Sequence, residues 1–158
     1  MSVSGRNVIG PPVDRRPVIA VFVAAFAADL LSKQWAVGHA SDLVFNPRPS
    51  DLPLRLLMSA VAIVVGLGLS RFAALSGLGR QWGLWIGCAL LVAGVLANGV
   101  SPFLWKQGIP DFIDVPGAWV WNLADFEIGV GLIGGILSLL VSAVFAYVRG
   151  LGSAGRAP

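Results

Sequence analysis

Residues 111–129 read DFIDVPGAWVWNLADFEIG and set a group of carboxylates beside a long apolar run. Four of the eight acidic residues of the chain fall here: Asp111, Asp114, Asp125 and Glu127. Carboxylates at or within a membrane are costly, and those that occur there usually mark functional positions. We therefore expect the functional site to lie in this stretch.

The composition of the whole chain is that of a membrane protein. Of its 158 residues, 56% are hydrophobic and 12% are charged, and that charged share is about half of what soluble domains carry. Several nearly uncharged runs approach the roughly 20 residues that cross a bilayer. No basic patch with interleaved aromatic residues is present, so we expect no nucleic-acid partner. The single cysteine, Cys88, lies in an apolar run and is interpreted as a small buried hydrophobe.

The apolar runs predict an all-α membrane protein with four transmembrane helices, at residues 17–37, 54–72, 82–100 and 121–148. Residues 39–53 and 101–120 are predicted loops, and 71–81 is a short connection. The first apolar run is too long for a signal peptide and contains Asp29 and Lys33, so we interpret it as a retained span. We expect a flexible cytoplasmic tail at 1–16, a single four-span domain at 17–149, and a second flexible cytoplasmic tail at 150–158.

The placement of basic residues predicts the orientation of the spans. The two tails and the 71–81 connection hold Arg6, Arg15, Arg16, Arg71, Arg80, Arg149 and Arg156. The other two loops and their edges hold only Arg48, Arg55 and Lys106. Because lysine and arginine accumulate on the cytoplasmic side, both termini are expected to be cytoplasmic and the acidic stretch to face outward.

Four further polar residues lie in or near the predicted spans. Asp29 and Lys33 are four residues apart, so they share a helix face. They are either a self-neutralising pair whose lysine reaches the interface, or a pair whose aspartate fixes part of the site. Asn98, near the end of the third span, can join helices through hydrogen bonds. Asn46 lies in FNPRP, a pattern typical of a turn.

Asp111 and Asp125 can form a catalytic pair if the 101–120 loop folds back towards the fourth span. Two carboxylates in contact share a proton and titrate together. The ionised carboxylate can then deprotonate a water, while the protonated one polarises a peptide carbonyl, and no metal is needed. Asn122 lies three residues before Asp125, on the same side of the helix, and can hold a carboxylate. Asp114 and Glu127 are expected to be solvated neighbours, Glu127 on another face of the helix.

The same residues follow motifs of a known family. DLLSKQW at 29–35 resembles Asp-x-x-Thr-Lys, and GVLANGVSP at 94–102 resembles Gly-x-x-Gly-Asn-x-x-Asp-Arg. PDFIDV at 110–115 resembles Val-Val-Asp-Phe-Ile-Asp, and WNLADFEIGVG at 121–131 resembles Phe-Asn-x-Ala-Asp-x-x-Ile-x-x-Gly. In this order and spacing, the four motifs resemble the bacterial lipoprotein signal peptidases (signal peptidase II), four-span aspartic proteases of the inner membrane. The resemblance covers residues 29–131.

The resemblance implies a role for each matching residue. It makes Asp111 and Asp125 catalytic, and assigns supporting roles to Asn122, Asn98, Asp29, Lys33 and Asn46. Two departures stand out: Ser101-Pro102 replaces the Asp-Arg of the family, and Asn46 is followed by Pro47-Arg48, where the family reads Asn-x-Gly-x-x-Phe.

The resemblance also implies a reaction. An aspartic endopeptidase of this kind removes the signal peptide of a lipid-modified prolipoprotein just before the diacylglyceryl-cysteine, outside the inner membrane and without a cofactor. Its partners would be that substrate and membrane lipid. We expect a monomer and leave a partner subunit open. Two other functions stay open: a proteolytically silent homologue that binds a lipopeptide or a partner's transmembrane helix, and an ion path through the intramembrane carboxylates.

Overall fold

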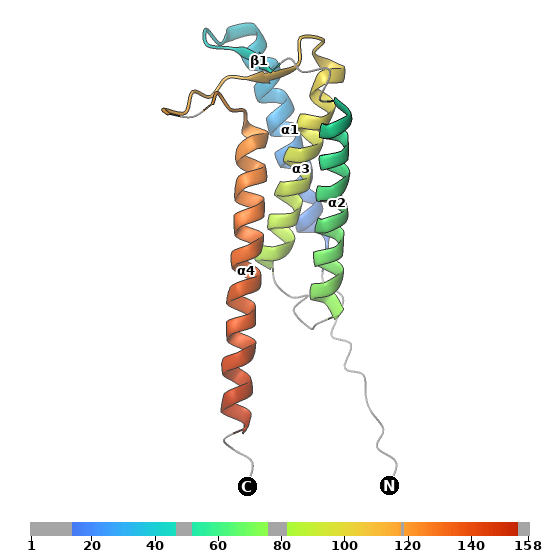
Figure 1. Cartoon of the computed structure of the whole chain (residues 1–158), viewed down its shortest axis with the longest axis vertical. Coiled ribbons are helices and arrows are strands. Elements are labelled where there is room, and N and C mark those ends of the chain that lie inside the picture. The colour runs from blue at the N-terminus through green and yellow to red at the C-terminus, as the bar shows by residue number, and fades with distance from the viewer. Residues whose placement is uncertain (1–13, 47–51, 76–81, 118, 155–158) are drawn as a thin grey trace.

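Four helices lie side by side, and two short strands cover one end of them (Figure 1). The computed structural model describes residues 14–46, 52–75, 82–117 and 119–154. Its elements are α1 (Arg16–His39), β1 (Val44–Asn46), α2 (Leu52–Leu75), α3 (Trp82–Leu104), β2 (Ile109–Asp111) and α4 (Leu123–Ala154). The start of α1 and the end of α4 lie at the end of the bundle away from the strands.

All four helices run past a predicted end, and α3 and α4 do so by the most residues. α3 continues to Leu104, so residues 101–104 are helical and not part of a loop. Pro102 lies inside the last turn of α3, where it lacks the N–H that would bond to the Asn98 carbonyl. α4 has 32 residues and continues to Ala154, into the stretch predicted as a tail. At 1.5 Å per residue it is about 48 Å long, more than the roughly 30 Å hydrocarbon core.

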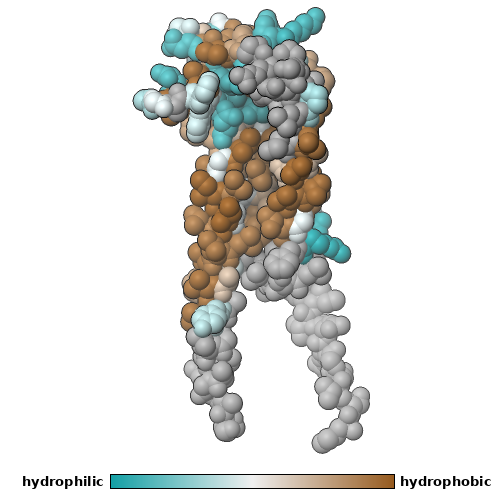
Figure 2. All heavy atoms as spheres, viewed as in Figure 1, coloured by the Kyte–Doolittle hydropathy of each residue, from teal (hydrophilic) through white to brown (hydrophobic). Residues whose placement is uncertain are grey.

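Within the described residues, three helices are long and apolar enough to cross a membrane: α1, α3 and the Leu123–Phe145 part of α4. In α2, the apolar stretch among the described residues is Ser59–Leu69. Hydrophobic side chains cover the helices, and hydrophilic ones gather at the end that carries the strands (Figure 2). The fold therefore places an apolar belt below a polar cap.

α3 is central, since it packs against α1, α2 and α4. Its contact with α4 is made by backbone at Gly87 and Gly131. A Cβ atom on Gly131 would lie 2.5 Å from the Leu91 nitrogen, and one on Gly87 would lie 2.8 Å from the Gly131 oxygen. Glycine at these positions lets two apolar helices approach closely, as it does at many membrane helix contacts.

The antiparallel pairing of β1 with β2 was not predicted from the sequence. Val44 lies opposite Asp111 and Asn46 lies opposite Ile109. An isolated bridge then joins Ile113 to Trp121, just before α4. These pairings fold the 105–121 segment back over the helix ends, which is what the catalytic-pair hypothesis requires of this loop.

Several expected features lie outside the described residues. They are the first part of the N-terminal tail (1–13), the Pro47-Arg48 part of the first loop (47–51), most of the 71–81 connection (76–81), and the end of the C-terminal tail (155–158).

Candidate active site

The site is built around the first turn of α4. Asn122 is the residue before the helix, and its Oδ1 accepts a hydrogen bond from the backbone N–H of Asp125 at 3.2 Å. In return, Asp125 Oδ2 accepts a hydrogen bond from the backbone N–H of Asn122 at 3.0 Å. This reciprocal pair is a capping box, which satisfies two backbone donors at the helix start. The need to cap α4 therefore also fixes the position of the Asp125 carboxylate.

Asn122 also binds the second carboxylate. Its Nδ2 donates a hydrogen bond to Asp111 Oδ1 at 2.6 Å. Asp111 is the last residue of β2 and is only 7% exposed, and Asn122 is 1% exposed. One buried asparagine thus contacts both aspartates that the sequence singled out, and the structure brings all three together.

Asp111 lies outside the helices and holds its proton more tightly than an ordinary aspartate. Burial, and to a smaller extent the nearby Asp125 carboxylate, raise the pKa of Asp111 from 3.8 to about 6. Hydrogen bonds from Asn122 and Asn46 and the charge of Lys33 act in the opposite direction. A proton shared near neutral pH is the property that a catalytic carboxylate pair needs.

Asn98 connects Asp125 to the neighbouring helices. From the last part of α3, its Nδ2 donates to Asp125 Oδ1 at 2.9 Å. Its Oδ1 accepts a hydrogen bond from Lys33 Nζ, on α1, at 2.7 Å. Asn98 therefore joins three helices, as expected, and contacts one of the proposed catalytic residues directly.

Asp29 and Lys33 form a salt bridge of 2.7 Å, and both side chains are fully buried. The two charges therefore neutralise each other, as one interpretation expected, but the buried Lys33 does not extend towards the interface as that interpretation also required. Asp29 Oδ1 accepts the backbone N–H of Ala124 at 2.7 Å, at the start of α4. A carboxylate at this point binds an unpaired backbone donor and complements the positive end of the helix dipole. The structure agrees with the alternative in which Asp29 fixes part of the site.

Ser101 is a site residue that the sequence did not identify. Its Oγ accepts a hydrogen bond from Lys33 Nζ at 3.2 Å and donates one to the Ala97 carbonyl at 2.7 Å. Ser101 is fully buried. The signal was its position, because the motif that the chain resembles has an aspartate there. In this chain the Ser101 hydroxyl accepts one hydrogen bond from the lysine.

The two remaining carboxylates of the stretch have different environments. Asp114 is exposed, as predicted. Glu127 is only 7% exposed, so its prediction as a solvated residue is wrong. The face of α4 that carries Glu127 is not turned outward: it packs against α3 at Gly94, where an added Cβ would lie 3.1 Å from the Glu127 Cβ.

Asp111 and Asp125 line a cavity of about 380 Å³. Its walls combine polar groups with large apolar side chains: Asn46, Asn98, Ile109, Asp111, Trp119, Val120, Trp121, Asn122, Asp125, Ile128 and Gly129. Asn46 lies at the end of β1 and is itself exposed. A cavity of this size is large enough for a short peptide segment. The described part of the chain contains no group of three or more residues suited to hold a metal ion.

The chain was compared with known families and structures. The family model described as "Signal peptidase (SPase) II" matches residues 43–141, which is 99 of the 158 residues. No curated protein matches the chain in sequence.

Two solved chains share the fold, and both are titled as a bacterial membrane enzyme structure obtained by the in meso method. The first has a TM-score of 0.63 and 17% identity, covering 80% of this chain and 89% of the other. The second has a TM-score of 0.61 and 17% identity, covering 78% of this chain and 92% of the other. With a family match over more than half of its length and three helices able to cross a membrane, the chain is a multi-pass membrane protein that belongs to the signal peptidase II family.

Proposed function

We propose that this protein is an active aspartic endopeptidase that removes signal peptides from lipid-modified prolipoproteins. One observation carries the proposal: Asn122 donates a side-chain hydrogen bond to Asp111 and a backbone hydrogen bond to Asp125. Both carboxylates are therefore hydrogen-bonded to one buried residue, and both line the same cavity.

The contacts of the two aspartates suggest how they divide the chemistry. Asp125 accepts hydrogen bonds on both oxygens, from Asn98 and from the Asn122 backbone, as an ionised carboxylate does. It acts as the general base that deprotonates water. Asp111, whose pKa is raised to about 6, carries the shared proton and donates it to the scissile carbonyl. The proton taken from water by Asp125 then passes to the leaving amine as the C–N bond breaks, and the proton that Asp111 gave to the carbonyl oxygen returns to Asp111 as the new carboxyl group forms.

The cavity walls suit a peptide whose neighbouring residue is lipid-modified. The polar lining groups of the cavity include the two carboxylates and the side-chain amides of Asn46 and Asn98, which can bind a peptide backbone. Its apolar lining residues include Ile109, Trp121 and Ile128, which offer apolar contact to a small side chain. The scissile bond lies before the diacylglyceryl-cysteine, whose acyl chains point into the lipid around the apolar belt (Figure 2).

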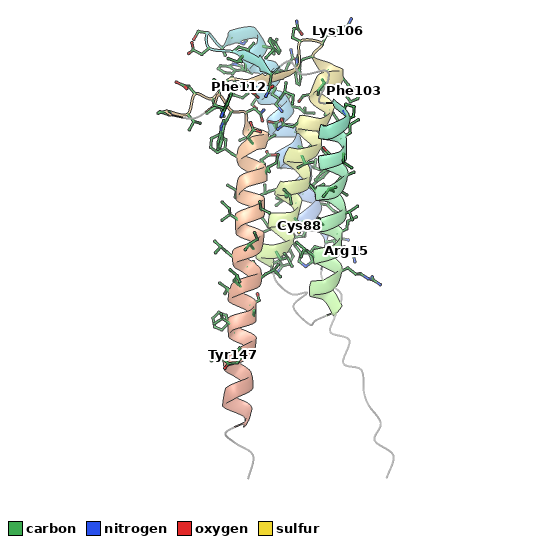
Figure 3. All side chains as sticks on the ribbon, viewed as in Figure 1. Arg15, Cys88, Phe103, Lys106, Phe112 and Tyr147 are labelled. Atoms are coloured by element: carbon green, nitrogen blue, oxygen red, sulfur yellow. The ribbon has the colours of Figure 1, made fainter. Side chains whose placement is uncertain are left out.

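The proposed topology has four spans and an outward-facing site in the bacterial inner membrane. α2 completes the set of four spans. Its 24 residues make about 36 Å of helix, and it packs against the central α3. Arg15 lies towards the end of the bundle opposite the strands, whereas Lys106 lies at the strand end (Figure 3). The larger number of arginines on the Arg15 side favours a cytoplasmic location for both termini.

Cleavage of a lipid-modified precursor by the purified full-length protein tests the proposal. We expect Asp111→Asn and Asp125→Asn each to lower the cleavage rate by about 10²–10⁴-fold, the usual contribution of a general acid or base. Both variants should still fold and insert. Asp114→Asn is the matched control, since this exposed carboxylate is outside the cavity and its loss should leave the rate unchanged.

Either of two results would reject this function. Normal processing by the Asp111 or Asp125 variant would show that the pair is not catalytic. An intact precursor bound tightly by the unmodified protein would instead identify a silent binding homologue.

A further inference from the structure

Gly129 lies inside α4, at a position where helix packing does not require a glycine. Glycine is the least favourable residue after proline in the interior of a helix. At Gly87 and Gly131 an added Cβ would meet the backbone of the facing helix, which explains those two glycines. Around a Cβ added at Gly129, in contrast, the described residues place no neighbouring atom within 4 Å. The missing side chain therefore leaves open space.

This space belongs to the cavity of the two aspartates. Gly129 is one of the residues that line the cavity. It follows Asp125 by four residues, so the two lie on the same face of the helix. At 1.5 Å per residue, Gly129 is about 6 Å further along α4 than Asp125. α4 starts beside the strands and runs from there into the bundle (Figure 1), so Gly129 lies on the apolar-belt side of Asp125.

The same face of α4 stays open beyond Gly129. Leu132 and Ile133 follow it by three and four residues, the spacing of neighbours on one helix face. Their side chains are 50% and 61% exposed. The cavity therefore adjoins the exposed apolar surface of the belt at Gly129. A peptide can reach the carboxylates along this face, because no side chain at position 129 stands in its way.

The direction of the proposed substrate decides which of its residues lies over Gly129. The signal peptide crosses the apolar belt and ends at the scissile bond, so the residues before that bond come from the Gly129 side of Asp125. In an extended chain each residue advances about 3.3 Å, and successive side chains point to opposite sides. The first side chain that can point to Gly129 is that of the residue just before the bond. The lipid-modified cysteine follows the bond and lies further away.

The surroundings of the space suit a branched aliphatic side chain. Ile128 and Trp121 are apolar lining residues of the cavity. Trp121 is held by its bridge to Ile113, and its ring packs against that of Phe126 with 5.0 Å between the centroids. Valine placed over Gly129 would exchange water for apolar contact, which is favourable. A glycine or an alanine of the substrate would leave part of the space empty.

We propose that Gly129 is a specificity-determining residue: the space over it receives the side chain of the residue just before the scissile bond. The protein consequently cleaves precursors in which that residue is valine, as well as those in which it is alanine or glycine. This inference rests on the proposed function for its effect on cleavage, whereas the position of a bound precursor does not depend on any reaction.

Cleavage of three precursors, with glycine, alanine or valine just before the lipid-modified cysteine, tests the proposal. In the unmodified protein, kcat/KM for the valine precursor should at least equal that for the alanine precursor. Gly129→Val fills the space from the protein side. We expect it to lower the ratio of kcat/KM for the valine precursor to that for the glycine precursor by about 10–200-fold, the usual discrimination of an apolar pocket. Because the ratio is measured within one variant, a loss of folded protein cancels from it.

Gly134→Val is the matched control for that variant. An added Cβ at Gly134 also meets open space among the described residues. Gly134 belongs to the same helix but is not a lining residue of the cavity. The ratio for the valine and glycine precursors should therefore stay as in the unmodified protein.

Disulfide trapping gives a second readout that does not depend on cleavage. The chain has a single cysteine, so Cys88→Ala provides a background without thiols, and Asp125→Asn keeps the precursor intact. Gly129→Cys in this background is mixed with a precursor that carries a free cysteine just before the scissile bond, and an added oxidant accepts the two electrons and two protons of the thiols. We expect a covalent complex. Gly134→Cys should give none, and a precursor with its free cysteine one residue earlier should give much less.

The two readouts separate this inference from the proposed function. If the unmodified protein cleaves none of the three precursors, the proposed function is wrong, and trapping still decides whether the precursor lies over Gly129. An unchanged ratio in Gly129→Val would overturn the inference, as would equal trapping by the Gly129→Cys and Gly134→Cys variants. Cleavage of the glycine and alanine precursors together with an intact valine precursor would overturn it as well.

Discussion

α3 and α4 meet in two different ways at two levels of the bundle. In the apolar belt, Gly87 and Gly131 bring the helix backbones into direct contact. At the polar end, the same two helices are joined by the hydrogen bond between Asn98 and Asp125. The glycine contact needs only the absence of side chains. The polar contact also involves Lys33 on α1, which donates to Asn98, and Asp111 on β2, which accepts from Asn122.

The difference shows how the two levels depend on one another. A hydrogen bond of 2.9 Å between Asn98 and Asp125 requires the helix spacing that the glycines permit. The glycine contact, in contrast, requires nothing of the carboxylates. Damage in the apolar belt should therefore reach the site, while damage at the site should leave the belt intact.

The largest effect on stability is expected from a methyl group in the glycine contact. Gly131→Ala places a Cβ 2.5 Å from the Leu91 nitrogen and 2.6 Å from the Gly87 oxygen, so the helices must separate. We expect a loss of about 1–3 kcal/mol in the free energy of unfolding, the usual cost of overpacking, together with slower cleavage. Unfolding in detergent micelles and the cleavage rate measure the two effects.

Gly134→Ala is the matched control for that variant. No atom lies within 4 Å of a Cβ added at Gly134, and alanine favours a helix over glycine by up to about 1 kcal/mol. The control should be neutral or slightly stabilising and should keep full activity. If Gly131→Ala behaved in the same way, the glycine contact would not set the helix spacing.

Two substitutions of Asn122 distinguish its role in capping α4 from its role in binding the Asp111 carboxylate. Asn122→Ala removes the cap and the bond to Asp111, and should cost about 0.5–2 kcal/mol of stability as well as activity. Asn122→Ser retains a capping oxygen but has no amide to donate to Asp111. We expect the serine variant to keep most of the stability and still lose cleavage. Equal activity of the serine variant and the unmodified protein would show that the Asp111 bond is not needed.

A further effect expected is a dependence on pH that comes from Asp111. Its pKa is about 6 in the folded protein against 3.8 ordinarily, so the folded state holds this proton more tightly. The resulting stabilisation is complete below about pH 4 and is lost as the pH rises through about 6. Cleavage at limiting substrate should also fall above about pH 6 because the proton donor is lost.

Asp111→Asn is the control for the stability part of this prediction. The asparagine does not titrate, so the decrease in stability between about pH 4 and 6 should disappear. Persistence of the same decrease in that variant would assign it to another group.

Much of the fold was predictable because membrane helices have a strong sequence signal. α1 starts and ends within two residues of its predicted bounds. The strands had no such signal: β1 and β2 have three residues each, and β2 contains Pro110. Their pairing depends on a contact between two loops that are distant in the chain, and no local pattern shows it.

The sequence predicted which residues make up the core of the site, but not which hydrogen bonds and packing contacts they form. Asp111, Asn122 and Asp125 lie together as expected, because each carries chemistry that an apolar chain does not otherwise need. The burial of Glu127 was not predicted. Its spacing from Asp125 shows that the two side chains lie on different faces of the helix, but it does not show which neighbour covers the Glu127 face. Ser101 was overlooked for a related reason, since only the fold shows that its hydroxyl lies at Lys33.

Cleavage in ¹⁸O-labelled water tests most directly the claim that Asp111 and Asp125 activate water. With enzyme in excess over a lipid-modified precursor, the account predicts a signal peptide whose new carboxyl group carries one ¹⁸O atom in the first turnover. The Asp125→Asn variant should give no product. An unlabelled signal peptide would show that a side chain attacked the bond, and an intact precursor would show that the pair does not catalyse proteolysis; either result would contradict the account.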